Sequence, residues 1–202
     1  PGPCSRAWTH CPRFIALDAA HGSSTYKGVV LAATAIVGAG QIFFIAIGFA
    51  TGETASSWRF FVENLADALN IRQMPLTIIR DRCKGIDSAV SLVLPRASHS
   101  FCAFHIKQNV LQKYGTGAAS FVFDIANAST AEEYKATMNA LSNVSPAAKV
   151  YLKKLKVNWV RAFFPMPRFG HVTSNVAESI NASLLECRKN PLSNCFRRQS
   201  TE

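Results

Sequence analysis

The residues from Val29 to Ala50 constrain the fold more than any other part of this sequence. They read VVLAATAIVGAGQIFFIAIGFA, in which only Thr34 and Gln41 are clearly polar, and a run of this length is able to cross a membrane as a helix. A turn signal, Gly38-Ala39-Gly40, divides the run into two halves that are rich in β-branched and aromatic residues. The pattern therefore favours two buried strands joined as a hairpin over a membrane span, and no membrane partner is expected.

Two short apolar segments that each end in an acid lie on either side of this hairpin. Phe14-Ile15-Ala16-Leu17 leads into Asp18, and Leu76-Thr77-Ile78-Ile79-Arg80 leads into Asp81. Both segments have the composition of buried strands, and in open α/β sheets functional side chains lie where strands end. The other elements expected in this half are strands at 28–37, 41–49 and 100–106, a helix that begins near Ser56-Ser57 and ends near Leu69, and a helix from Gly85 to Pro95.

Three strands, a helix, a strand, a helix and a fifth strand match the order of a ribonuclease-H-like sheet. In such a mixed α/β sheet the first and fourth strands lie side by side and parallel, so Asp18 and Asp81 would share one edge. Arg80 and Arg82 alternate to the face opposite Asp81, so they need not pair with it. Two carboxylates held close repel each other, and a Mg²⁺ or Mn²⁺ ion between them relieves that repulsion.

The second half of the chain carries helical patterns. Thr130-x-x-Glu133 is a capping box that opens one helix, and Ser145-Pro146 opens another that is expected to continue towards Phe164. The cations of this second helix suit either a DNA backbone or a solvated surface, and the candidate DNA-binding residues are Lys149, Lys153, Lys154, Lys156 and Arg161. We expect an irregular lead-in at 1–13, a core sheet with helices at 14–110, a helical insertion at 111–172, a helix with a third acid, Glu178, at 173–192, and a basic tail at 193–202.

Charge and cysteine content narrow the class of partner. The chain of 202 residues has 22 Lys and Arg against 12 Asp and Glu, a formal net charge of +10, which favours a polyanionic partner and nucleic acid first. The six cysteines include no CxxC pair, which is typical of reduced intracellular thiols. No signal peptide is visible, and Pro1 at the first position indicates a fragment or a processed chain.

The acids and the segments around them resemble the Mutator-like element (MULE) transposases over nearly all of residues 14–192. The resemblance rests on the joint order and spacing of several motifs, each of which is weak alone. They are the strand with Asp18 and the following Tyr26-Lys27-Gly28-Val29-Val30-Leu31, Gly52-Glu53 with Ser56-Ser57-Trp58, Ile79-Arg80-Asp81-Arg82 with Gly85-Ile86, Cys102-x-x-His105 with Asn109, and Thr173-Ser174-Asn175-x-x-Glu178-Ser179-x-Asn181.

The resemblance implies a DDE-type catalytic core in which Asp18, Asp81 and Glu178 hold two divalent metals, Mg²⁺ or Mn²⁺. It implies cleavage of DNA strands at element ends followed by strand transfer, with DNA as partner, a homo-oligomer as the assembly and the nucleus as the location. Helices between the second Asp and the Glu are expected in this family. The chain departs from the family pattern at Arg80, where a small or hydroxyl residue is usual, and at Ala19-Ala20, where Gly or Thr usually follows the first acid.

Several of these residues also have structural interpretations. Glu178 lies three residues after Asn175, so the pair is close to a capping box that would occupy the carboxylate. Cys102 and His105 are half of a zinc site without a second ligand pair at suitable spacing, and a structural role near the active site is favoured for them. His21 and Glu53 lie close to strand ends and either assist the acids or belong to a solvated turn and a helix start.

Three functions are therefore open from the sequence. The first is a metal-dependent DNA transposase catalytic domain. The second is a domesticated or decayed relative that acts as a non-catalytic DNA-binding or regulatory module, like the plant transcription factors derived from this family. The third is an unrelated ribonuclease-H-like nuclease. Retention of all three acids favours the first, although the zinc-dependent DNA-binding segments of full transposases are not part of this sequence.

Overall fold

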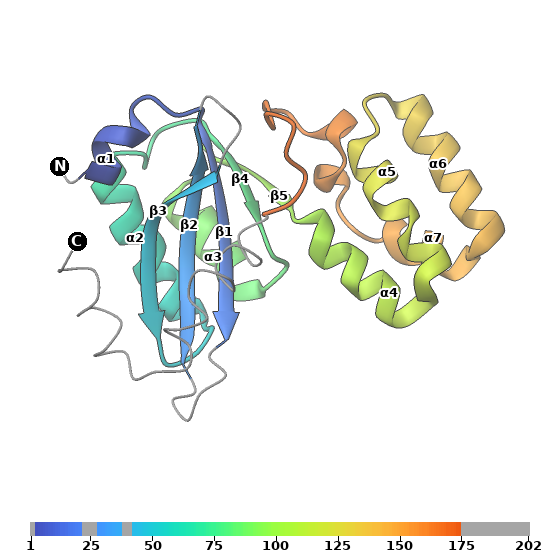
Figure 1. Cartoon of the computed structure of the whole chain (residues 1–202), viewed down its shortest axis with the longest axis horizontal. Coiled ribbons are helices and arrows are strands. Elements are labelled where there is room, and N and C mark those ends of the chain that lie inside the picture. The colour runs from blue at the N-terminus through green and yellow to red at the C-terminus, as the bar shows by residue number, and fades with distance from the viewer. Residues whose placement is uncertain (1–2, 22–27, 38–41, 175–202) are drawn as a thin grey trace.

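The structure, a computed structural model, describes residues 3–21, 28–37 and 42–174. It has two parts: a sheet with helices packed on it, and a group of helices that extends from one edge of that sheet (Figure 1). The sheet part, blue to green in the figure, contains Asp18 and Asp81, and the helical part, green to orange, follows it in the chain. Asp18 was expected to end its strand, but β1 continues to His21.

The sheet has five strands in the spatial order β3-β2-β1-β4-β5. Strands β1 and β2 and strands β2 and β3 pair antiparallel, whereas β1 pairs parallel with β4 and β4 with β5. The strands are β1 (Phe14–His21), β2 (Val29–Ile36), β3 (Ile42–Ala50), β4 (Thr77–Arg80) and β5 (Ser98–Phe101). The mixed α/β sheet predicted from the sequence is confirmed, including the parallel pairing of the first and fourth strands.

The apolar run from Val29 to Ala50 forms the antiparallel pair β2 and β3, as the sequence predicts. Val29 pairs with Ala50 and Ile36 with Ile42, with one irregularity in register between Ala33 and Thr34. Every residue of β2 is buried, which explains why the run lacks the alternation of a half-exposed strand. Among the residues that the structure describes, no helix has the length and apolar character needed to cross a membrane.

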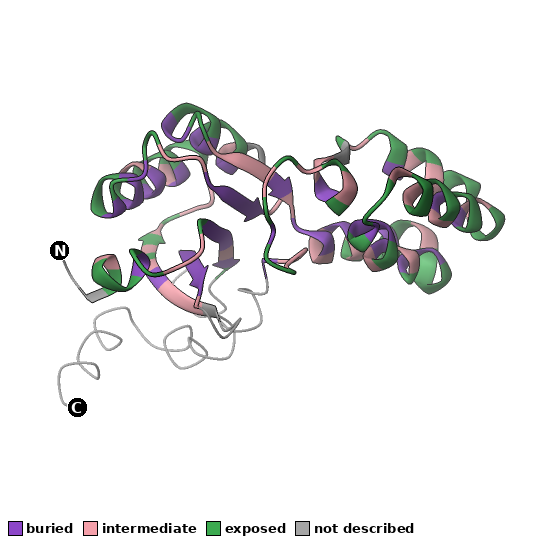
Figure 2. Ribbon diagram, turned by 90° about the horizontal axis from the view of Figure 1, so that it is seen from above, coloured by how far each residue is buried: buried purple, intermediate pink, exposed green. Residues whose placement is uncertain are grey.

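One face of the sheet is covered by two helices, α2 (Ala55–Leu69) and α3 (Lys84–Val93), and by the short α1 (Pro3–Trp8). Figure 2 shows that the buried sides of these helices are turned towards the sheet. The core between the sheet and the helices contains Ile15, Leu17, Leu31 and Ile78 of the sheet, Trp58, Val62 and Leu65 of α2, and Ile86 and Val90 of α3. Burial of these side chains, each contributing about 1.5–3 kcal/mol, is what holds the helices on this face.

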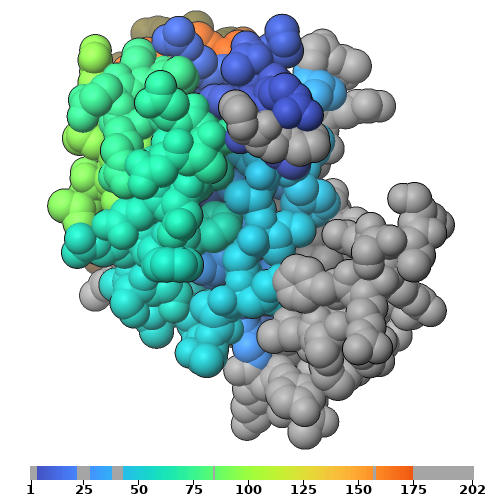
Figure 3. Space-filling view, turned by 90° about the vertical axis from the view of Figure 1, so that its left-hand side faces the viewer, coloured from blue at the N-terminus to red at the C-terminus, as the bar shows by residue number. Residues whose placement is uncertain are grey.

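Glycine allows α2 to pack closely on the edge strand β3. A Cβ atom at Gly48 would lie 2.7 Å from Cδ2 of Phe61, which is closer than real Cβ contacts allow. Figure 3 shows the resulting surface, on which α2 and β3 lie against each other. Gly48 therefore serves packing in this strand rather than a turn.

The opposite face of the sheet carries a smaller cluster that contains Phe14, Ala16, Ala20 and Ile79. Because side chains alternate along a strand, Asp18 belongs to this same face of β1. Ile15 and Leu17 point to the helix-covered face instead. The acid of β1 is thus placed away from α2 and α3.

The helical part begins directly after β5. Its elements are α4 (Ala103–Ala119), α5 (Phe121–Asn127), α6 (Ala131–Val144), α7 (Pro146–Lys153) and two short 3₁₀ helices, η1 (Val157–Trp159) and η2 (Arg161–Phe163). They enclose a separate apolar core around Trp159, Leu141 and Leu152. Gly115, with φ of 84°, kinks α4 before its last turn.

The helix starts agree with the capping signals in the sequence. The Thr130 hydroxyl accepts a hydrogen bond from the Glu133 N–H at 3.1 Å, and the Ser145 hydroxyl accepts one from Ala148 N–H at 3.2 Å. For α2, however, the cap is Thr54 and not Ser56 or Ser57, since the Thr54 hydroxyl accepts from Ser57 N–H at 3.1 Å.

Three expected boundaries differ in the structure. Residues 1–13, expected to be irregular, contain α1. The expected strand at 100–106 ends at Phe101, and α4 takes over at Ala103, so the helical part starts before residue 111. The helix opened by Ser145-Pro146 ends at Lys153, and the two 3₁₀ helices replace its expected continuation because Trp159 and Val160 turn into the helical core.

Candidate active site

Asp18 lies in the middle of β1 and is almost completely buried, with 2% of its surface exposed. One carboxylate oxygen, Oδ1, accepts a hydrogen bond from the N–H of Ala19 at 2.9 Å. The other, Oδ2, accepts one from the hydroxyl of Ser174 at 3.4 Å. Ser174 is distant in sequence and reaches Asp18 from the segment that returns from the helical part. The carboxylate is therefore oriented by its own strand and by this returning segment.

Asp81 follows the last residue of β4 and comes beside Asp18 through the parallel pairing of their strands. Leu17 is the partner of Arg80 in that pairing, so the next residue on each strand is an acid. The Asp81 side chain is 34% exposed, and its backbone neighbour Arg82 donates its N–H to the carboxylate. The structure thus joins a buried and a partly exposed carboxylate at one site, as the strand order predicts.

His105 lies between the two carboxylates. Its Nε2 atom is 4.0 Å from Oδ1 of Asp18, and its Nδ1 atom is 3.9 Å from Oδ1 of Asp81. The residue comes from the first turn of α4, whose N-cap is Cys102. Because α4 and not a strand carries these residues, Cys102 and His105 lie one turn apart on the same side of the helix. Both are next to the acids, the position that the sequence analysis favoured for them.

Burial determines the charge of Asp18. Desolvation raises the pKa of Asp18 from 3.8 to about 6, although the nearby His105 and the N–H of Ala19 oppose the rise, and the charge of Asp81 adds to it. A carboxylate with a raised pKa is an unfavourable charge in the folded protein. A cation beside Asp18 would remove much of that penalty.

His105 and Cys102 have pKa values that shift in opposite directions. Burial alone would lower the pKa of His105, but the Cys102 side chain and the two acids outweigh burial and raise it to about 9. For Cys102, burial raises the pKa, but contacts with His105 and Ser174 outweigh it and lower the value. Ser174 contributes its N–H and hydroxyl, at 3.2 and 3.3 Å from Cys102 Sγ. Protonated His105 is thus the cation that faces both acids here.

The arginines that flank Asp81 bind elsewhere. The Arg80 guanidinium is buried, forms an ion pair with Asp87 of α3 and also donates to the backbone oxygen of Asp81. The Arg82 guanidinium donates to the hydroxyl of Tyr151 at 2.7 Å. This agrees with the sequence prediction that neither side chain needs to pair with the Asp81 carboxylate. Arg80, the departure from the family pattern, is accommodated by Asp87.

A groove of about 240 Å³ is lined by the two arginines that flank Asp81 in the chain, by Asp87 and Phe101, and by residues that follow α7. Its lining includes Arg82 and two of the predicted DNA-binding residues, Lys154 and Lys156. The other predicted cations do not share this groove: Lys149 donates to the side chain of Asn139 at 3.0 Å, and Arg161 lines a different pocket. Lys153 is exposed. The groove therefore brings part of the predicted basic face together with Arg82, the residue that follows Asp81.

Glu53 and His21 contact each other at the end of the sheet. Nε2 of His21 is 3.5 Å from Oε2 of Glu53, and Oε1 of Glu53 accepts a hydrogen bond from the indole N–H of Trp58 at 3.1 Å. The bond to the buried Trp58 fixes the start of α2, which is the helix-leading role that the sequence left open for Glu53.

The third predicted acid, Glu178, lies outside the described residues. Within the described ranges, no group of three His, Cys, Asp or Glu side chains is arranged to hold a metal ion. Sequence reasoning did not single out Ser174, which contacts both Asp18 and Cys102, as a site residue of its own. It lies in the Thr173-Ser174-Asn175 motif, which was the only signal available for it.

A mixed sheet with two acids at the junction of its central parallel strands defines this chain as an α/β protein with a paired-carboxylate site. Residues 14–109 match the family model described as the MULE transposase domain. This match confirms, over these residues, the resemblance seen in the sequence. It includes Asp18, Asp81, Cys102 and His105.

Two curated proteins are similar to parts of the chain. Protein FAR1-RELATED SEQUENCE 6 of Arabidopsis thaliana is 28% identical over 101 residues, which are 50% of this chain and 14% of that protein. The PKS-NRPS hybrid synthetase cheA of Chaetomium globosum is 26% identical over 140 residues, which are 65% of this chain and 3% of that protein. The chain thus spans a small part of the length of both relatives.

Proposed function

We propose that this chain contains the catalytic core of a metal-dependent DNA transposase, which cleaves a phosphodiester and transfers the freed strand. One observation carries the proposal: Asp18 and Asp81 meet from adjacent parallel strands, and Asp18 is buried with its pKa raised to about 6. The strand order also fits a ribonuclease-H-like sheet, the fold that the family resemblance implies. The proposal includes a nuclear location and a homo-oligomeric assembly.

The donor set suits Mg²⁺ or Mn²⁺. Both ions prefer carboxylate oxygens and keep positions for water or phosphate. Asp18 and Asp81 would be ligands, with Glu178 as the third by resemblance, and a bound ion would supply Lewis-acid stabilisation of charge on the phosphoryl oxygens. In this assignment the Ala19 N–H and the Ser174 hydroxyl orient Asp18, and the fixed strand pairing holds Asp81 beside it.

The basic groove gives the substrate a position. Arg82, Lys154 and Lys156 line one groove, and Arg82 follows Asp81 in the chain, so these cations would attract the phosphates of a DNA strand that reaches the acids. The formal net charge of +10 acts in the same direction over a longer range. We assign these three cations to binding of the DNA backbone, which contributes affinity without sequence specificity.

A non-catalytic DNA-binding or regulatory module derived from the same family is the second candidate. The position of His105 favours it, because an imidazolium within about 4 Å of both carboxylates offsets part of their negative charge without any metal. Under this alternative the acids and His105 form a structural ion cluster. The basic groove would still bind DNA, but divalent ions would change neither stability nor the DNA.

Thermal unfolding with increasing Mn²⁺ separates the two candidates. If the acids hold metal, Mn²⁺ raises the melting temperature of the wild type but not that of Asp81→Asn, which keeps the shape of the side chain and loses its charge. Glu63→Gln is the matched control, because it removes a partly exposed acid of α2, paired with Arg59, on the other side of the sheet. An equal Mn²⁺ response in wild type and Asp81→Asn would contradict metal binding by the acid pair.

A Mn²⁺-dependent nicking assay on supercoiled plasmid DNA then tests catalysis. We expect nicking by the wild type and by Glu63→Gln, and its loss in Asp18→Asn, Asp81→Asn and Glu178→Gln. Wild-type protein that binds Mn²⁺ through Asp81 but leaves the plasmid intact would support the non-catalytic module. Cleavage of RNA–DNA hybrids in preference to DNA would instead indicate a ribonuclease.

A further inference from the structure

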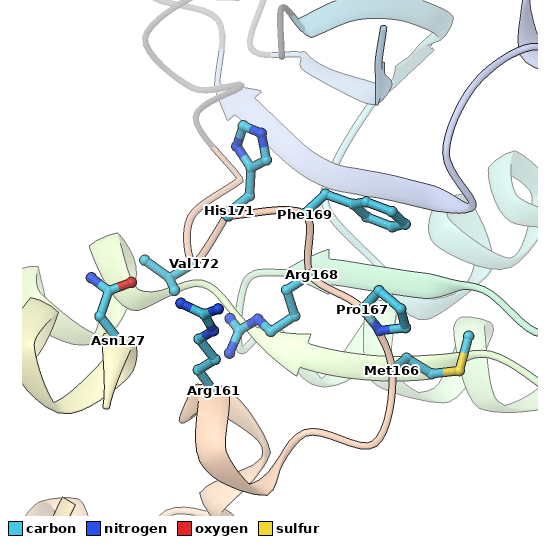
Figure 4. A pocket seen from close by; sticks show the side chains of 9 residues that line it. Asn127, Arg161, Met166, Pro167, Arg168, Phe169, His171 and Val172 are labelled. Carbon is cyan, nitrogen blue, oxygen red and sulfur yellow. The ribbon is translucent and has the colours of Figure 1, made fainter. Parts of the chain in front are cut away.

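A pocket of about 350 Å³ lies where the returning segment, residues 165–174, passes between the helical part and the sheet. The pocket is lined on one side by this segment and on the other by Asn127 at the end of α5 and Arg161 of η2 (Figure 4). Two hydrogen bonds anchor the segment, since Pro167 O accepts from the Thr77 hydroxyl at 2.7 Å and Val172 O from Ala103 N–H at 2.9 Å. The pocket therefore has a fixed wall.

Arg168 is the unusual residue of this pocket. It is 5% exposed, its Nη1 donates a hydrogen bond to the backbone oxygen of Trp159 at 2.8 Å, and its guanidinium carbon lies 5.3 Å from the centre of the Phe164 ring. Its Nε and Nη2 atoms are buried without a hydrogen-bond partner in the part of the chain that the structure describes. A buried donor without an acceptor costs about 1–3 kcal/mol, and more for a charged group. Arg168 is therefore poised to bind an acceptor.

Arg161 adds a second guanidinium to the same pocket. Figure 4 shows the ends of Arg161 and Arg168 close together beside Val172, and the two repel each other electrostatically. Burial lowers the pKa of Arg168 to about 10, with Cys102 opposing the shift and Arg161 adding to it, so the side chain remains charged at neutral pH. The residues that line the pocket include no carboxylate. Two converging cations without an acid between them are the chemistry of an anion site.

The rest of the lining indicates which anion fits. Phe169 is 46% exposed beside the arginines, and Met166 and Pro167 continue the apolar wall. A phosphodiester presents oxygens for two guanidinium groups and an adjacent sugar for an apolar surface. The same segment ends at Ser174, whose hydroxyl binds Asp18, so the pocket and the acids are joined by a short, anchored stretch of chain.

We propose that Arg168 and Arg161 bind one phosphate of a DNA backbone in this pocket, a contact separate from the basic groove that Arg82 lines. The proposal rests on the assignment of DNA as substrate and adds to it a defined anchoring point. Arg168 supplies a buried guanidinium group with two N–H-bearing nitrogens that are free among the described residues, and the exposed Arg161 contacts the same phosphate from η2. Phosphate held here positions the strand relative to the acids, so both arginines are positioning residues and not catalytic ones.

Inorganic phosphate is the first probe. Thermal unfolding of the wild type in sodium phosphate, compared with sodium chloride of equal ionic strength, should show a higher melting temperature in phosphate. Arg161→Gln should lose this difference while keeping its melting temperature in chloride, because Arg161 is exposed. Arg59→Gln, which removes the same charge from α2 on the far side of the sheet, should keep it. A phosphate response that survives in Arg161→Gln, or is missing from the wild type, overturns the proposal.

Measuring DNA binding in EDTA distinguishes a site for a DNA backbone phosphate from a site for free inorganic phosphate. With a fluorescein-labelled duplex, Arg161→Gln should bind about tenfold more weakly than the wild type. The slope of log K against the logarithm of the salt concentration should decrease by the amount that corresponds to about one phosphate contact. Arg168→Lys, which keeps the charge and loses the guanidinium group, should weaken binding similarly, and Arg59→Gln should not. Unchanged duplex binding in Arg161→Gln and Arg168→Lys overturns the DNA assignment, even if inorganic phosphate stabilises the protein.

The DNA-binding measurements and the nicking assay can give independent results. If Asp81→Asn abolishes Mn²⁺-dependent nicking while both arginine variants bind and nick DNA like the wild type, the proposed function stands and the anchoring site is wrong. If both arginine variants lose DNA affinity while no variant or wild type nicks DNA, the anchoring site stands and belongs to a non-catalytic DNA-binding module.

Discussion

Asp18→Asn is expected to make the protein more stable at neutral pH when no divalent metal is present. The pKa of Asp18 is about 6 in the folded protein against an ordinary value of 3.8. Each pKa unit corresponds to about 1.4 kcal/mol, so the difference of about 2.2 corresponds to a penalty of about 3 kcal/mol. Because the folded-state pKa is the higher one, the penalty is absent below pH 3.8, grows between the two values and is complete above about pH 6.

An asparagine at this position retains the shape of the side chain and the acceptor for Ala19 N–H. It loses attraction to His105, but that attraction already lowers the pKa on which the penalty is based. We therefore expect the free energy of unfolding to rise by about 2–3 kcal/mol at about pH 7.5, and the gain to disappear near pH 4. Urea unfolding in EDTA, followed by circular dichroism at both pH values, measures it.

Asp67→Asn provides a control of opposite sign. The hydrogen bond from Arg72 lowers the pKa of Asp67, so its charge is favourable in the folded protein above its ordinary pKa and that benefit fades as the pH falls. Asp67→Asn should therefore be slightly less stable than the wild type at neutral pH. If Asp18→Asn is also less stable, or if its gain is the same at both pH values, the buried carboxylate is not the source of a penalty and the electrostatic reasoning fails.

Two further variants test how the fold holds the site. Asp87→Asn leaves the buried Arg80 guanidinium with a neutral partner and should lower the free energy of unfolding by about 1–2 kcal/mol, as measured by urea titration. The expected loss is modest because the Asp87 side chain is about half exposed. An unchanged free energy of unfolding would mean that solvent satisfies Arg80. Gly85→Ala should lower the free energy of unfolding by more than about 2 kcal/mol, since its Cβ would lie 2.9 Å from the backbone nitrogen of Ala55. Gly117→Ala, at an exposed position of α4, should change the free energy of unfolding by less than about 1 kcal/mol. Similar values for the two variants would refute the packing argument.

The order of elements could be predicted because the strands are short apolar runs with clear ends. The acid after each of two such runs indicated a shared sheet edge, and the structure brings Asp18 and Asp81 together as expected. That result depended on the parallel pairing of strands that are distant in sequence, which came from the element order and from the family resemblance rather than from local pattern. The catalytic role of the acids stays a prediction.

The start of α4 could not be predicted from local pattern. Residues 100–106 form a short, mostly apolar segment that suits a buried strand, and Cys102 is not a residue that normally caps a helix. The change to helix at Ala103 is set by tertiary packing, because Ala103, Ile106 and Val110 enter the helical core. This change of element is what brings His105 round to the acids.

The burial of Arg168 had no sequence signal at all. Arginine is rarely buried, and the segment around it has neither the period of a helix nor that of a strand. Its depth follows from two anchors formed by other elements, Thr77 on one side and Trp159 on the other. Sites made by an irregular segment between two cores are visible only once both cores are placed.

The acid pair itself bears on the choice between a catalytic and a non-catalytic protein. If Asp18 served only to hold the fold, an amide at the same position would still accept from Ala19 N–H, could donate to the Ser174 hydroxyl in place of accepting from it, and would avoid a penalty of about 3 kcal/mol. His105 reduces that penalty without removing it, since the pKa of Asp18 stays near 6 with the imidazole in place. A divalent ion, with twice the charge and direct contact to both carboxylates, would offset it more fully. The electrostatic penalty that remains on Asp18 therefore supports a carboxylate that serves as a metal ligand, and it favours the metal-dependent enzyme over the structural ion cluster.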